Sequence, residues 1–289
     1  MSLTPFRIPI VPELRKNTIL SLIAKGLRVD DRDIVTPRNV KIETGVIEKA
    51  EGSALVRLGA TQVMVGVKAE IGSPFRDTPD EGVITVNAEF VPLASPMFEP
   101  GPPDENAIEL ARVIDRSIRE VNAVDRKALV IRPGEKVWVL FIDIYVLNHD
   151  GNLFDASMLA TMAALATTKL PDYEEYETGD IEIVREKTIG PLKLNHIVLT
   201  STIAKIGDYI IADPNLDEET VSDTRIVFAF DENGRIVGAQ KTGMGAITLD
   251  ELYRALKIAK QAANVYFKSL EEALGGRLPV ERQGVEGHG

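Results

Sequence analysis

Residues 137–169 read VWVLFIDIYVLNHDGNLFDASMLATMAALATTK, and this stretch decides the fold that we expect. Residues 137–147 are apolar except for Asp143, which predicts a strand covered on both faces. Residues 148–152 supply the polar side chains and the glycine of a turn. Residues 156–168 carry no charge, so we predict a helix that is buried all round in the middle of a domain.

A strand, a tight turn and a helix in this order direct backbone N–H groups and the positive end of a helix dipole at one spot, where a phosphate can bind. The first turn of the expected helix contains Asp155, however, and His149 and Asp150 precede it. A carboxylate that caps the helix competes with a bound anion. The backbone pattern therefore favours a phosphate site, whereas the side chains do not.

The composition is that of an acidic, cysteine-free globular protein. The 289 residues carry a formal net charge of −11 and are 44% hydrophobic, enough for one large domain or two modest ones. With no cysteine and three histidines, we expect no disulfide scaffold, no metal site and no cofactor. An acidic chain binds nucleic acid only through a local basic patch or a basic partner.

The sequence argues against two kinds of targeting segment, a signal peptide and a membrane span. Pro5, Pro9 and Pro12 interrupt the apolar residues at the beginning of the chain, which argues against a signal peptide. The longest uncharged helical stretch is shorter than the roughly 18 residues that a membrane span needs. We therefore expect a cytoplasmic protein that does not enter a membrane.

Strands and helices follow one another in the same order in two halves of the chain. After an N-terminal arm and a short helix in residues 1–27, the first half (28–175) has strands expected at 40–47, 53–58, 62–70 and 83–91, which we interpret as an antiparallel meander. An acidic stretch at 171–180 is predicted to be a solvated connector, and the second half covers 190–275. A tail without core residues, 276–289, should be mobile. This order indicates an α+β fold, with helices packed on largely antiparallel sheets.

The helix expected at residues 106–121 carries a basic stripe. Arg112, Arg116 and Arg119 are spaced to lie on one side of it, where they could bind a polyanion. The alternative is surface pairing with the neighbouring acids at helical spacing, which are Glu109, Asp115 and Glu120.

Two charged stretches allow both structural and functional interpretations. The segment GLRVDDR at residues 26–32 is interpreted as a solvated, salt-bridged connector. Further along, five carboxylates lie within eleven residues: Asp213, Asp217, Glu218, Glu219 and Asp223. They could hold a divalent metal with phosphate ligands, act as general acid and base, or form an acidic loop, and their spacing does not decide between these roles.

Five segments together carry a resemblance to a known family. They are GLRVDDR (26–32), EGSALVRLGATQVMVGVKAE (51–70), FEPGPPDENAIELARVIDRSIRE (98–120), NLFDASMLATMAAL (152–165) and IADPNLDEET (211–220). In this order they resemble the RNase PH family, and within it most closely the non-catalytic ring subunit of the archaeal exosome. The resemblance covers about residues 25–268 and implies a duplicated α+β RNase PH-type fold, in agreement with the pattern of strands and helices.

The resemblance also implies a function. Catalytic members of the family hold phosphate and RNA with an arginine pair before the first long helix and with a Gly-Ser/Thr-Arg type loop before the buried helix. The matching positions here fall near residues 102–105, which include Asp104 and Glu105, and near Asn152, Phe154 and Asp155. The cations are missing there and acids stand in their place. The acids from Asp217 to Asp223 are retained. We therefore expect no catalytic residue in this chain.

The role that the resemblance implies is that of a non-catalytic subunit in an alternating hexameric ring. Its expected partners are a catalytic sister subunit, RNA-binding cap subunits and single-stranded RNA, and its expected task is to structure the sister's active site for phosphate-dependent 3′-to-5′ RNA degradation. With this resemblance, we predict that Arg112, Arg116 and Arg119 bind RNA. Two alternatives stay open on the sequence. One is a phosphorolytic exoribonuclease that is active by itself, and the other is a small-molecule-binding domain of metabolic type.

Overall fold

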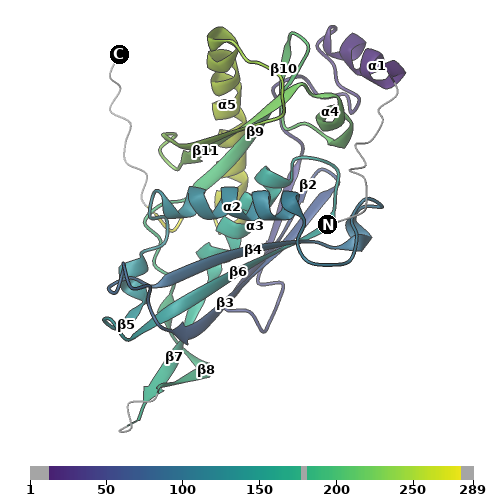
Figure 1. Cartoon of the computed structure of the whole chain (residues 1–289). Coiled ribbons are helices and arrows are strands. Elements are labelled where there is room, and N and C mark those ends of the chain that lie inside the picture. Colours follow the sequence, from purple (N-terminus) through teal and green to yellow (C-terminus); the bar gives the residue numbers. More distant parts are fainter. Residues whose placement is uncertain (1–12, 177–180, 281–289) are drawn as a thin grey trace, which may run out of the picture.

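The computed structural model describes residues 13–176 and 181–280 (Figure 1). Two sheets lie on either side of one helix, α3 (Leu153–Thr167), and a two-stranded ribbon projects from one end. Within the described ranges no helix combines the length and the apolar character that crossing a bilayer demands. The expected arm at residues 1–12 and the end of the expected tail at residues 281–289 lie outside the described residues.

The first sheet has the strand order β1-β2-β3-β6-β4, and β5 pairs with β6 beyond this path. Its strands are β1 (Val40–Thr44), β2 (Gly52–Leu58), β3 (Thr61–Gly72), β4 (Val83–Phe90), β5 (Val130–Arg132) and β6 (Lys136–Asn148). The predicted meander is wrong for its fourth strand, because β6 lies between β3 and β4 and runs parallel to β4. Parallel neighbours need a long crossover, and α2 (Glu105–Arg119) provides it between β4 and β6.

Strand β6 is the centre of this sheet, as expected, but only one of its faces is fully buried. Trp138, Leu140, Ile142, Ile144 and Val146 are buried, while the side chains between them are only half-buried. The helices α2 and α3 cover the first face alone, since α2 contacts β4 and α3 contacts β2 and β3. The prediction of a strand covered on both faces is therefore wrong for the isolated chain.

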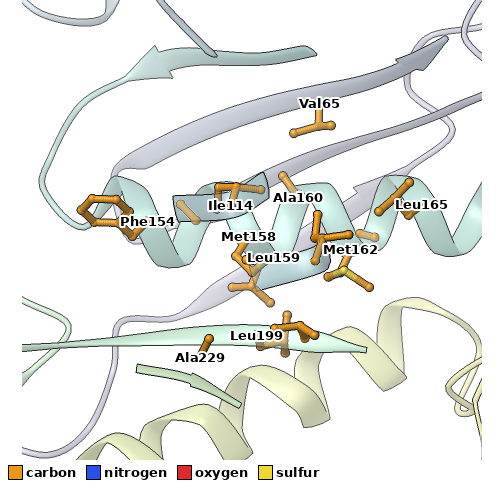
Figure 2. Packing of buried hydrophobic residues seen from close by; sticks show 14 of the residues in the cluster. Val65, Ile114, Phe154, Met158, Leu159, Ala160, Met162, Leu165, Leu199 and Ala229 are labelled. Atoms are coloured by element: carbon orange, nitrogen blue, oxygen red, sulfur yellow. The ribbon is translucent and has the colours of Figure 1, made fainter. Parts of the chain in front are cut away.

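Helix α3 is buried along nearly its whole length, as the sequence predicts. Every side chain from Phe154 to Leu165 is buried, and the helix contacts β3 of the first sheet and β9 of the second (Figure 2). Full burial of a Leu or Met side chain stabilises a fold by about 1.5–3 kcal/mol. Large apolar side chains of α3, among them Met158, Leu159, Met162 and Leu165, thus hold both sheets together.

The second sheet is wholly antiparallel, in the order β10-β9-β11-β12. Its strands are β9 (Val198–Ile206), β10 (Tyr209–Ala212), β11 (Thr224–Asp231) and β12 (Ile236–Thr242). Helix α5 (Leu249–Ala273) contacts β9, β10 and β11, and starts at a capping box formed by Thr248 and Glu251. Helix α1 (Glu13–Ile23) forms a small second core with this sheet through Ile19 and Ile23. Two short 3-10 helices, η1 (Pro92–Ala94) and η2 (Arg126–Leu129), lie in the connections of the first half.

Three other expectations need correction. Residues 171–175 are not a connector, because β7 (Lys169–Glu175) pairs with β8 (Ile181–Pro191) to form the projecting ribbon (Figure 1). Residues 177–180 of the same stretch lie outside the described residues. The acidic segment after β10 is not an irregular loop, since it forms the short helix α4 (Leu216–Val221). Finally, the tail does contribute to the core, because Leu278 is 4% exposed and packs in the main cluster.

Candidate functional site: a closed ionic network at the start of the central helix

Asp213 is the centre of a network that joins both halves of the chain. Its side chain is fully buried, and its backbone is left-handed with φ 47°, a conformation that Asp tolerates better than most residues. One carboxylate oxygen accepts hydrogen bonds from the backbone N–H of Arg38 at 2.7 Å and from its Nε at 2.9 Å. The other accepts from Nη2 of Arg38 at 2.8 Å and from Nδ2 of Asn152 at 2.6 Å.

Arginines keep Asp213 ionised despite its burial. Burial by itself would raise the pKa of the Asp213 carboxyl, but the hydrogen bonds and the charge of Arg38, helped by the charge of Arg32, outweigh it and lower the pKa. Arg32 Nη1 lies 3.2 Å from Asp213 Oδ2. A buried pair of this kind loses much stability when one partner is removed, because the other charge is then left without compensation.

Asn152, rather than Asp155, caps the central helix. Asn152 has φ 51°, and its side-chain oxygen accepts a hydrogen bond from the backbone N–H of Asp155. Asp155 instead points to the second sheet, where its carboxylate accepts from the backbone N–H of Thr202 at 2.9 Å and from the Thr202 hydroxyl at 2.8 Å. The expectation that a carboxylate occupies the first turn is confirmed, but its role is to link α3 to β9.

Burial raises the pKa of the Asp155 carboxyl to about 6, although hydrogen bonds from Asn152 and Thr202 act in the opposite direction. Burial also raises the pKa of the Tyr266 hydroxyl, and the charges of Asp213 and Asp155 add to this effect. The Tyr266 hydroxyl therefore stays protonated. The interior between α3, β9 and α5 thus contains one acid that titrates close to neutral pH.

The segment at residues 26–32 is salt-bridged and largely exposed, as the sequence predicts, but Arg28 within it is buried and belongs to this network. Arg28 is 2% exposed and donates from Nε to Glu218 Oε1 at 2.8 Å, while its Nη2 contacts the other oxygen of the same carboxylate. Its Nη1 donates to the carbonyl of Ala212 at 2.7 Å. Two arginines from this segment, Arg28 and Arg32, thus bind the end of β10 and the start of α4.

The backbone N–H at the start of α3 already has an anionic partner. Glu219 Oε1 accepts from the backbone N–H of Asn152 at 2.9 Å and forms an ion pair with Arg225 Nη1 at 2.7 Å. The glycine before Asn152 permits this approach, since a Cβ on Gly151 would lie 2.5 Å from the backbone of Asn215 and Leu216. A protein carboxylate therefore occupies the position where a phosphate would bind to the helix N-terminus.

The remaining acids of the cluster are also engaged. Asp217 pairs with Arg15, and Asp223 accepts from the backbone N–H of Gly207 at 2.7 Å and lies 3.5 Å from Lys16. Together with Asp213, Glu218 and Glu219, all five predicted carboxylates thus have a cation or an N–H group as partner. Of the roles left open by the sequence, the geometry favours a structural one.

The loop before α2 carries acids at its end, as the sequence implies. Asp104 caps α2 by accepting from the backbone N–H of Ala107 at 2.8 Å, and Glu105 lies in the first turn of the helix. Phe98 of the same loop stacks between Phe90 and His149, with ring centroids 4.8 Å and 5.4 Å apart. Burial lowers the pKa of His149, so this ring is neutral at pH 7.

The predicted arginine stripe on α2 makes no hydrogen bond with this network. Arg116 donates from Nη2 to Gln240 of β12 at 2.8 Å. Arg119 pairs with Asp115 at 2.7 Å and donates to the carbonyl of Ile84 at 3.1 Å, as the pairing alternative predicts for it. Arg112 is exposed and, within residues 13–176 and 181–280, has no ion-pair partner.

A single group in the described part of the chain approaches the arrangement of a metal site, namely His196, Asp231 and Glu232. Its carboxylates already have partners: Glu232 accepts from the backbone N–H of Ile197 at 3.0 Å, and Asp231 accepts from Arg235 Nε at 2.7 Å. His196 Nδ1 lies 3.0 Å from Glu232 Oε1. The absence of a metal site, expected from the sequence, stays a prediction.

The residues that close the network were not expected from the sequence. Arg28 and Asn152 lie in segments that the sequence singles out. The network partners of Arg28, Arg38, Asn152 and Arg225 gave no local signal, because each partner lies far away along the chain or belongs to a different element. The one signal in the sequence was that several arginines precede β1, and these can pair with the acids of the cluster.

Comparisons with known proteins place this fold and site in a family. The chain belongs to the 3′ exoribonuclease family: the profile of domain 1 matches residues 36–171 and that of domain 2 matches residues 196–262. Its fold is accordingly the two-domain RNase PH fold expected from the resemblance.

Among individual proteins, the chain is 64% identical to the exosome complex component Rrp42 of Aeropyrum pernix, over 95% of this chain and 99% of that protein. It is 53% identical to the protein of the same name from Thermococcus gammatolerans, over 93% and 98% of the two chains. Among solved structures, a chain of the Archaeoglobus fulgidus exosome with RNA bound to the active site is 45% identical, with a TM-score of 0.81 over 89% of this chain and 97% of that one. A chain of an archaeal exosome core is 40% identical, with a TM-score of 0.77 over 90% and 97%.

Proposed function

We propose that this chain is a non-catalytic subunit of an archaeal exosome ring, in which it alternates with a catalytic sister subunit. It structures the sister's active site for phosphate-dependent 3′-to-5′ degradation of RNA. The names of the relatives from Aeropyrum pernix and Thermococcus gammatolerans support the assembly. RNA-binding cap subunits as further partners, and a cytoplasmic location, are part of the same proposal.

The observation that supports a non-catalytic role is that a protein carboxylate already occupies the N-terminus of α3. At the start of α3, Glu219 accepts a hydrogen bond from the backbone N–H of Asn152. Asp155 stands at a position that the family resemblance matches to the phosphate-binding loop, and it accepts a hydrogen bond from Thr202. A carboxylate about 5 Å from a bound phosphate costs on the order of 3 kcal/mol at an effective dielectric constant near 20. That is on the order of 100-fold in rate. Asp104 and Glu105, in place of the second set of cations, add a similar loss.

Three cations do lie close to these acids, but none is available to a substrate. Arg38 is held by Asp213 and by the carbonyl of Asp150, Arg225 is held by Glu219, and Arg28 is buried against Glu218. Binding a phosphate here would require breaking a buried ion pair, which costs several kcal/mol. The alternative of a self-sufficient phosphorolytic exoribonuclease is therefore not favoured.

The proposal is tested by incubating 3′-labelled RNA and inorganic phosphate with this chain alone, with the sister subunit alone and with both. We expect nucleoside diphosphates from the mixture, less from the sister and none from this chain. Phosphate-dependent product from this chain alone would overturn the non-catalytic assignment. Gel filtration tests the assembly separately, because a small-molecule-binding domain would elute unchanged when the sister is added.

A further inference from the structure

The outward side of α5 is strongly basic, although the whole chain is acidic. Residues 252–270 contain no Asp or Glu, in a protein that has 44 acids and a net charge of −11. Four cations of this stretch are exposed: Arg254, Lys257, Lys260 and Lys268. The polar side chains of Gln261 and Asn264, which are also exposed, lie between them along the helix. The sequence pattern alone did not reveal this surface, which we call the α5 basic face.

The helix presents these cations on one side because the residues on its other side are buried in the core. Ala255, Ala259, Ala263, Tyr266 and Leu270 are buried, and α5 contacts β9, β10 and β11 of the second sheet (Figure 1). The cations follow Arg254 by three, six and fourteen residues. At 3.6 residues per turn, all four therefore lie within about one third of the helix circumference. At 1.5 Å per residue, they extend over about 21 Å of helix axis.

The cations of the α5 basic face have little internal compensation. Among the described residues, Arg254, Lys257 and Lys260 form no ion pair. Lys268 lies 3.9 Å from Glu272, but these side chains are 79% and 69% exposed, and such a pair is worth little. On α2, by contrast, Arg116 and Arg119 already have partners. An uncompensated row of like charges repels itself and attracts a polyanion.

One end of the α5 basic face also carries an exposed aromatic ring. Tyr253, next to Arg254, is 63% exposed. Surfaces that bind single-stranded nucleic acid combine a row of cations along the backbone with aromatic side chains on which bases stack. The combination therefore favours a nucleic acid. Aromatic side chains are also frequent at protein–protein interfaces, so binding of a protein is an outcome that the experiment must distinguish.

We propose that the α5 basic face binds the phosphate backbone of single-stranded RNA and that Tyr253 stacks on one of its bases. The choice of RNA among polyanions rests on the proposed function, whereas the location of the surface does not. The contact is sequence-independent and adds to any contact made by α2. Because the cations are exposed and away from the ionic network, their removal leaves the fold unchanged.

The experiment measures the affinity of the full chain, and of its complex with the sister, for fluorescent oligoadenylate by anisotropy over a series of salt concentrations. The test variant is Lys257→Gln/Lys260→Gln. The control is Lys127→Gln/Lys187→Gln, which removes the same charge from exposed positions on η2 and β8. For single strands, each phosphate that a cation no longer binds lowers the slope of log affinity against log salt by about 0.7, so we expect a decrease of about 1.4 for the test variant and none for the control.

Tyr253→Phe and Tyr253→Ala separate stacking from charge. We expect Phe to keep the affinity for RNA and Ala to lower it by several-fold, with the salt slope unchanged in both variants. Equal effects of the test and control lysine pairs, or an unchanged slope for the test pair, would overturn the proposal. So would loss of complex formation in the test variant with RNA binding intact, since the face would then bind a protein. Failure of the proposed function would appear instead as product released by this chain alone.

Discussion

Asp213 accepts hydrogen bonds from both the backbone N–H and the guanidinium of Arg38, which lies 175 residues earlier in the chain. The pair joins the segment before β1 to the end of β10, and Asn152 connects it to the central helix. The same contacts that hold the two halves together also use up the charges that could bind a phosphate. The contacts that stabilise the fold therefore also occupy the start of α3, among the described residues, where an anion could bind.

Removing Arg38 should destabilise the protein strongly. Arg38→Met leaves the buried carboxylate of Asp213 without its main partner, and we expect a loss of about 3–5 kcal/mol in the free energy of unfolding. Urea denaturation measures this loss. Arg57→Met is the matched control, because Arg57 pairs with Glu43 at the surface and its loss should cost no more than about 1 kcal/mol. Similar losses for the two variants would contradict the central role of the Asp213 pair.

Gly151→Ala should separate the turn before α3 from α4. Gly151 has φ +79°, and an added Cβ would lie 2.5 Å from the backbone of Asn215 and Leu216. Gly134→Ala is the control, because Gly134 has φ +76° but open space around it, so this change causes only the strain of a left-handed residue, about 1–2 kcal/mol. Thermal unfolding should place Gly151→Ala clearly below this control, and equal melting temperatures would exclude a tight contact here.

The free energy of unfolding should depend on pH because Asp155 titrates. The folded-state pKa of Asp155 is raised from 3.8 to about 6, so the folded state favours the protonated acid. Its contribution to stability is therefore largest below about pH 4 and falls as the pH rises to about 6, by roughly 3 kcal/mol. Asp213 does not mask this change, because its lowered pKa places its own effect below pH 3.8.

Asp155→Asn removes this titration. We expect the free energy of unfolding of the variant to fall less, or rise more, than that of the unmodified chain between about pH 4 and pH 6, even though the loss of hydrogen bonds to Thr202 lowers it throughout. Urea denaturation at several pH values measures both effects. Glu99→Gln, at an exposed loop position, should leave the pH dependence unchanged. Parallel pH profiles for Asp155→Asn and the unmodified chain would show that Asp155 titrates normally.

The stripe on α2 is expected to act on RNA mainly through Arg112. Replacing Arg112 and Arg116 with Ala in the assembled ring should weaken RNA binding similarly for all sequences, with a salt slope lower by about 0.7 for each phosphate that is no longer bound. Arg119→Ala is the control, because Arg119 is already held by Asp115 and the Ile84 carbonyl. Anisotropy titrations over a salt series measure the slope, and light scattering checks the ring. Loss of the ring, or an unchanged slope, would assign these arginines a structural role.

Local patterns in the sequence determined the elements of this protein. The apolar run at residues 137–147 and the uncharged run at 156–168 predict β6 and α3 within a few residues. They do so because the spacing of apolar side chains indicates which faces of an element are buried. The capping residues Asp104 and Thr248 likewise mark the starts of α2 and α5, because a cap acts within one helical turn. Family motifs added the duplicated fold and the loss of cations at two loops.

Tertiary structure alone decided which strands are neighbours and which charges meet. The position of β6 between β3 and β4 depends on the crossover through α2, which no local pattern encodes. Arg28, in a segment that looks solvated, becomes buried against Glu218 because the chain returns to it 190 residues later. The cations of α5 stay exposed for the opposite reason: no acidic segment folds back over them among the described residues. Which distant charges form pairs depends on how the whole chain folds. Local sequence patterns do not specify this.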